Sequence, residues 1–132
     1  MSEAKPRLAF APGSHSIAAY GQGAFAFAGM SHEGSILATP TGVQPIDATS
    51  VDDLDPAALA PLLTEITQSP GSIEFVVVGT GERLAPIPRA TRAALGQAGL
   101  RFEAMATGPA LRIYNVMQSE GRRVAAALIA AP

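Results

Sequence analysis

The sequence contains no cysteine and no tryptophan, and its 9 Lys and Arg residues are outnumbered by 11 Asp and Glu residues. Without cysteine, disulfides, thiol catalysis and thiolate metal sites are excluded. A net charge of −2 leaves no basic excess to neutralise phosphates, so we expect no nucleic-acid partner. Only His15 and His32 offer imidazole, and neither belongs to an HExxH or similar spacing. We therefore expect no metal site.

Long hydrophobic runs are also absent. The longest, from Val124 to Ala131, is far shorter than the roughly 20 residues of a membrane-spanning helix. No apolar core of the length that a signal peptide needs follows the N-terminal residues 1–7. We expect a soluble, cytoplasmic protein that does not insert into membranes.

The strongest structural signal is the stretch 73–81, in which three consecutive valines precede Gly79 and Gly81. A short, nearly continuous apolar run predicts a strand that is buried on both faces of a sheet. The glycines predict a tight turn at its end. Because helical patterns lie on both sides of this strand in the sequence, a layered α/β domain is expected.

The first third of the chain favours antiparallel β-structure. Apolar runs flank Gly21-Gln22-Gly23 and predict a β-hairpin over 17–28, followed by strands over 35–39 and 43–46. Residues 1–12 are polar with two prolines and are interpreted as a flexible tail. Residues 13–132 then form a single α/β domain.

Three helices are predicted in the rest of the chain. The first begins with Asp55 as N-cap and Pro56 at the first helical position, and Pro61 should kink it or split a first turn from a second segment. The second covers 88–98. The third is capped by Thr107. Its expected apolar contacts are Ala110, Ile113, Tyr114 and Met117. Strands over 100–105 and 124–129 follow the second and third helices.

A candidate ligand or partner site is expected where strands end. Ligands of open α/β sheets bind beyond the carboxyl ends of strands, and glycine turns admit anions to backbone N–H groups. A helix N-terminus at Thr107 favours anions, and the Arg112 guanidinium can hold a carboxylate or phosphate. The candidate residues are Gly79, Thr80, Gly81, Met105, Thr107, Arg112, Tyr114 and Asn115.

A structural interpretation of the same residues stays open. The glycines then form only a tight turn, because Leu84 stands where a dinucleotide fingerprint needs its third glycine. Arg112 then pairs with Glu103 or Glu120, or binds backbone carbonyls near the sheet edge. Asn115 satisfies loop backbone groups, and Tyr114 packs its ring with the hydroxyl near water. No catalytic residue is assigned.

An ordered set of short motifs resembles the Mth938-domain family, which comprises small α/β proteins mostly of unassigned function. The motifs are Tyr20 to Phe25, Gly34 to Leu37, Gly79-Thr80-Gly81, Gly99-Leu100, Met105 to Met117 and Glu120 to Leu128. The mitochondrial member of this family is an assembly factor for respiratory complex I. Two positions depart from the family pattern: Ile46 follows Pro45 where a tryptophan is frequent, and Ile113 replaces a usual threonine.

The resemblance implies a three-layer β/α fold with a central mixed sheet, helices packed on it and an N-terminal β-hairpin. It implies no established activity, cofactor or active-site residues. The first hypothesis is a non-catalytic interaction protein, with respiratory complex subunits or assembly factors as partners and a contact patch at Phe25 and Phe27. The alternative is a small-molecule or anion-binding protein or enzyme, with its pocket near Gly79–Gly81, Thr107 and Arg112. A homodimer through an exposed edge strand of the first third is a further possibility.

Overall fold

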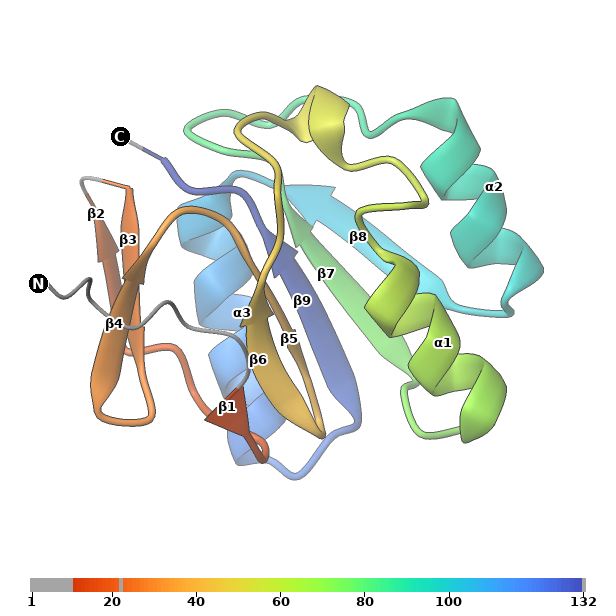
Figure 1. Ribbon diagram of the computed structural model, residues 1–132, viewed down its shortest axis with the longest axis horizontal. Coiled ribbons are helices and arrows are strands. Elements are labelled where there is room, and N and C mark those ends of the chain that lie inside the picture. The colour runs from red at the N-terminus through yellow and green to blue at the C-terminus, as the bar shows by residue number, and fades with distance from the viewer. Residues whose placement is uncertain (1–10, 22, 132) are drawn as a thin grey trace, which may run out of the picture.

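The computed structural model describes residues 11–21 and 23–131, which form two β-sheets and three α-helices. The larger sheet has six strands in the order β1-β6-β5-β9-β7-β8 (Figure 1). Its strands are β1 Ala11–Pro12, β5 Ile36–Thr39, β6 Gly42–Pro45, β7 Phe75–Gly79, β8 Arg101–Met105 and β9 Val124–Leu128. Strands β7, β8 and β9 are parallel, whereas β9–β5, β5–β6 and β6–β1 pair antiparallel, so the sheet is mixed as expected.

The smaller sheet contains the expected hairpin, formed by β2 Ala19–Gly21 and β3 Ala24–Phe27, and gains a third strand, β4 Met30–Glu33. Residue 22 lies outside the described residues. The turn between β3 and β4 places Ala28 and Gly29 at φ +50° and +76°. Positive φ at both central residues is the geometry of a type I′ turn, which matches the twist of the strands.

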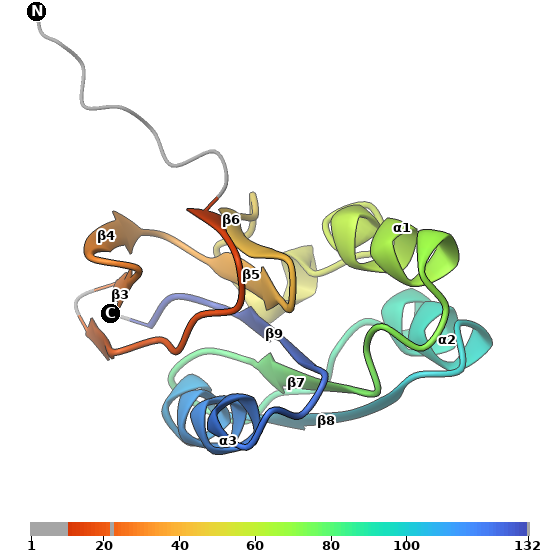
Figure 2. The same cartoon turned by 90° about the horizontal axis from the view of Figure 1, so that it is seen from below.

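The helices lie on opposite faces of the larger sheet (Figure 2). Helix α3 Thr107–Ser119 covers one face. Helices α1 Ala60–Gln68 and α2 Arg89–Gln97, with the 3-10 turn Val51–Asp53, cover the other. The three-layer arrangement with a central mixed sheet is therefore confirmed. None of the helices in the described ranges is long and apolar enough to cross a bilayer.

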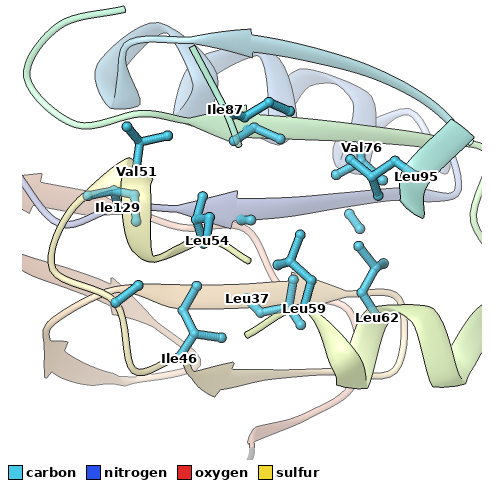
Figure 3. Packing of buried hydrophobic residues seen from close by; sticks show 14 of the residues in the cluster. Leu37, Ile46, Val51, Leu54, Leu59, Leu62, Val76, Ile87, Leu95 and Ile129 are labelled. Carbon is cyan, nitrogen blue, oxygen red and sulfur yellow. The ribbon is translucent and has the colours of Figure 1, made fainter. Parts of the chain in front are cut away.

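Strand β7 supplies side chains to both cores, which explains its continuous apolar sequence. Val76 and Val78 both belong to the core between the sheet and the α1/α2 layer, and Figure 3 shows Val76 in it. Val77 points into the second core, beneath α3 and the hairpin. All three valines are at most 1% exposed. The expectation of a strand buried on both faces is confirmed.

The predicted start of α1 was wrong. Asp55 accepts a 2.9 Å hydrogen bond from the Ala58 N–H, but it caps a turn over 56–59 that directly precedes the helix, and the helix begins only at Ala60. Pro61 therefore lies in the first helical turn, where its missing N–H would have no intrahelical partner. The turn over 56–59 precedes the helix without belonging to it, so the expected split of a first turn from the helix is observed and the expected kink is not.

The start of the larger sheet also differs from the expected tail boundary at residue 12. Ala11 and Pro12 form β1 and pair with Val43 and Gly42 at the edge of the sheet. The remainder of the expected tail, residues 1–10, lies outside the described residues.

Candidate functional site

The turn after β7 brings together five of the eight candidate residues. The Thr80 N–H donates to the Met105 carbonyl over 2.8 Å, and the Thr107 N–H donates to the Gly81 carbonyl, also over 2.8 Å. Gly81 adopts φ +110°, a conformation that favours glycine. The carboxyl ends of β7 and β8 and the start of α3 therefore meet here, as predicted.

Thr107 does not cap α3, contrary to the prediction. Ala106 is the N-cap and Thr107 is the first helical residue. The Thr107 hydroxyl accepts a 2.9 Å hydrogen bond from the Gly81 N–H and donates a 2.8 Å hydrogen bond to the Ile129 carbonyl. Through these two bonds, the fully buried side chain of Thr107 connects the turn after β7, the start of α3 and the segment after β9.

Gly79 permits the close approach of α3 to β7. A Cβ atom at Gly79 would lie 2.9 Å from the Thr107 hydroxyl oxygen and 3.0 Å from the Thr107 Cα. The space beside the glycine is therefore filled by Thr107. The geometry here is that of a packed junction, in agreement with the structural interpretation of the glycines.

Thr80 holds the segment that follows the turn. Its hydroxyl donates to the Arg83 carbonyl over 2.6 Å and accepts a 3.1 Å hydrogen bond from the Ala85 N–H. The segment 80–88 has no helix or strand of its own. These two hydrogen bonds fix its path toward α2.

Tyr114 and Asn115 contact the segment before the hairpin. The Asn115 side chain accepts a 2.8 Å hydrogen bond from the Ile17 N–H and donates one of 2.8 Å to the Ile17 carbonyl. It therefore satisfies backbone groups, as the structural interpretation predicts. The Tyr114 hydroxyl donates to the His15 carbonyl over 2.7 Å, and burial raises the pKa of Tyr114 to about 12. The expectation that this hydroxyl lies near water was wrong.

Arg112 lies on the outer side of α3. It is exposed, and among the described residues it forms no ion pair, so the expected pairing with Glu103 or Glu120 was wrong. Ile113, expected to face the core, is 42% exposed, and Val116 is 55% exposed. Residues three or four apart share a side of a helix. We call Arg112, Ile113 and Val116 the α3 face.

The side chains of Phe25 and Phe27 do not form the expected exposed patch. Phe25 and Phe27 are only 1% and 3% exposed, because both pack into the core beneath α3. Alternation in a strand identifies which side chains share a face but does not say which face is covered. The α3 face replaces the hairpin as the exposed apolar surface that we consider below.

An open groove that the sequence did not reveal lies on the other face of the larger sheet, beside β8. The groove has a volume of about 480 Å³. The lining residues are Leu84, Ala85, Pro86, Ile87, Arg92, Phe102 and Ala104. The only available signal was the apolar, proline-containing segment 84–88, which has no helical or strand period. Periodicity cannot predict a groove wall made of irregular chain.

Comparison with known proteins places this fold in a family. A family model described as "Protein of unknown function (DUF498/DUF598)" matches residues 17–129. An uncharacterized protein of Rhodobacter capsulatus is 37% identical over 127 residues, which cover 96% of this chain and 94% of that protein.

Solved structures of bacterial proteins share this fold over most of the chain. A crystal structure described as an outer membrane protein from Bartonella henselae has a TM-score of 0.83 and 38% identity, covering 92% of this chain and 98% of that one. The solution structure of a Bordetella pertussis protein, described as a Mth938-like domain, has a TM-score of 0.74 and 27% identity, covering 88% of this chain and 85% of that one. The chain therefore belongs to the DUF498/DUF598 family of Mth938-like proteins, whose function is unknown.

Proposed function

We propose that this protein is a non-catalytic interaction protein that assists the assembly of a larger protein complex. The observation that carries the proposal is the α3 face, where two large apolar side chains are exposed beside an arginine without an ion-pair partner among the described residues. Protein interfaces combine apolar contact area with arginine, which is enriched there relative to the rest of the surface. Arg112 adds a guanidinium that can hold a partner's carboxylate.

Respiratory complex I is the assembly that the family resemblance suggests. By analogy with the mitochondrial assembly factor, the proposed partners are subunits or assembly factors of this complex, met in the cytoplasm. Analogy within a fold family is the only basis for this choice, since function is carried by sites rather than by folds.

The strand-end turn supports the ligand-binding alternative less well. Its Thr107 hydroxyl already has a donor and an acceptor, and Thr107 fills the space at Gly79. Arg112 is exposed on α3, whereas Thr107 is fully buried. A ligand would have to displace packed protein groups at this turn.

Affinity capture of the tagged protein from its own host tests the proposal. We expect subunits or assembly factors of respiratory complex I to be enriched with the wild-type protein and lost with Val116→Asp, because a charge at that position cannot be buried at an apolar contact. Ala93→Asp, at an exposed position of α2, is the matched control and should retain the partners. Capture without such proteins, or equal capture by Val116→Asp, would contradict the proposal.

A further inference from the structure

The groove beside β8 lies at a free sheet edge. Strand β8 pairs with β7 along one side, and no other strand of the described chain pairs with it. Its Phe102 and Ala104 side chains contribute to the groove and pack against the core on the α2 side of the sheet. An unpaired strand edge offers backbone N–H and C=O groups to another extended chain.

The opposite wall of the groove is held in place before any partner arrives. The Thr80 hydroxyl fixes Arg83 and Ala85 through their backbone groups, and Ile87 is anchored in the core at 6% exposure. Leu84, by contrast, is 67% exposed. A wall with a fixed backbone reduces the entropy that binding would otherwise cost.

The charge of this region favours an acidic partner. Arg92 is the one charged residue lining the groove within the described ranges, and it forms no ion pair there. More widely, residues 75–131 contain seven arginines and three glutamates, whereas residues 11–74 contain seven acidic residues and no lysine or arginine. The half of the chain that forms the groove is therefore the positively charged half, which attracts acidic ligands.

We propose that this groove binds an extended acidic segment of a partner protein, which pairs with the free edge of β8, inserts an apolar side chain beside Leu84 and Phe102, and places a carboxylate at Arg92. An extended peptide suits the site better than a small molecule does, because the groove is open and lies beside an unpaired strand edge, whereas a small ligand is mostly enclosed by its pocket. This inference rests on the proposed role as an interaction protein, but it concerns a different surface from the α3 face.

A synthetic peptide with the order Thr-Glu-Thr-Leu-Thr-Glu-Thr provides a defined probe. Alternation places Leu and both Glu side chains on one face of the peptide, so either strand direction brings a carboxylate toward Arg92. Two control peptides carry Lys in place of Glu, or N-methylated backbone amides that cannot form strand hydrogen bonds. Binding is measured by fluorescence anisotropy, and the contact is located by amide hydrogen exchange.

We expect the acidic peptide to bind about tenfold or more tightly than either control peptide, since each control lacks the charge or the backbone pairing. The amides of β8 should become protected from exchange. Leu84→Asp and Arg92→Glu should each weaken binding by about tenfold or more. Val116→Asp on the α3 face should leave binding unchanged, which separates this proposal from the proposed function.

Four results would overturn the proposal. These are no binding up to about 1 mM peptide, equal binding of the N-methylated peptide, unchanged binding by both groove variants, and protection of residues other than those of β8. Analytical ultracentrifugation covers a further case: a wild-type dimer that becomes monomeric in Leu84→Asp would show that a second copy of the chain occupies the groove. Leu84 and Arg92 are exposed, so both variants should keep the wild-type melting temperature.

Discussion

The side-chain hydroxyl of Thr107 lies 2.9 Å from the backbone nitrogen of Gly81 and accepts its hydrogen bond. The same hydroxyl donates to the carbonyl of Ile129, so one side chain connects the turn after β7, the start of α3 and the segment after β9. The partners are 26 and 22 residues away from Thr107 in the sequence. The sequence left an anion site and a purely structural role open at this helix end, and the structure has an intramolecular hydrogen-bond junction there.

Thr107→Val tests the importance of this junction. The substitution keeps the size of the side chain but leaves the Gly81 N–H and the Ile129 carbonyl buried without their partner. We expect the free energy of unfolding to fall by about 3 kcal/mol, because each unsatisfied buried group costs roughly 1–3 kcal/mol. Chemical denaturation measures the change. Thr64→Val, at an exposed position of α1, is the control and should stay within about 0.5 kcal/mol of wild type. An equal effect of both variants would show that the hydrogen bonds of Thr107 do not stabilise the fold.

Gly79→Ala tests the close approach of α3 to β7. The added methyl group would lie 3.0 Å from Leu128 Cδ2 and 2.9 Å from the Thr107 hydroxyl oxygen, closer than ordinary contacts allow. Overpacking of this kind should destabilise the protein by about 1–3 kcal/mol. Gly96→Ala in α2 has open space around its Cβ position and should instead stabilise the helix by about 0.5–1 kcal/mol. Thermal and chemical unfolding of the two variants should therefore change in opposite directions.

Asn115→Ala tests the connection between α3 and the hairpin. The variant removes both hydrogen bonds to Ile17, whose side chain is completely buried, and should cost about 2 kcal/mol. We expect faster amide hydrogen exchange in β3 and β4, with β7 and β9 unchanged. Gln118→Ala removes only an exposed 3.2 Å hydrogen bond to Ser14 and serves as control. Exchange that accelerates equally throughout both sheets would show that Asn115 acts globally rather than on the hairpin.

Tyr114→Phe tests a pH dependence on the alkaline side. Burial raises the pKa of Tyr114 from 10.0 to about 12, so the folded state favours the neutral phenol. The corresponding stabilisation is fully present below pH 10 and is lost as the pH rises through about 12. At neutral pH, loss of the hydrogen bond to His15 should cost about 1 kcal/mol. Denaturation at increasing pH should show a decline in wild-type stability that the variant shows less strongly; identical alkaline profiles would contradict a buried phenol.

The sequence was most informative where the signal is local. Three consecutive valines identified β7 as a strand buried on both faces, because residues on both sides of a strand must be apolar when both sides are covered. Gly99 and Gly121 follow the C-caps of α2 and α3 with φ of +75° and +76°, the left-handed conformation in which glycine commonly ends a helix. The motif order identified the family, and the mixed sheet with helices on both faces followed.

The exposed surfaces required the tertiary structure. Phe25 and Phe27 appeared to be candidates for a surface patch, but they are buried because α3, more than 80 residues later, lies over the hairpin. Ile113 appeared to be a core residue, but the side of α3 that faces the sheet is the one carrying Ala110, Leu111 and Tyr114. Which side of a helix faces a sheet depends on all the contacts that this side makes, and many of these contacts come from distant parts of the chain.

The sequence by itself therefore determined most of the helices and strands and the family, since these depend on neighbouring residues and on their spacing, but it did not predict β1, β4 or the start of α1 at Ala60. Only the tertiary structure decided that Thr107 bonds Gly81 and Ile129, that Asn115 completes the backbone of Ile17, and that a groove opens beside β8. Each of these features joins segments that are distant in the chain. Such contacts are selected by packing and hydrogen-bond satisfaction of the whole fold, for which a single sequence contains no local signal.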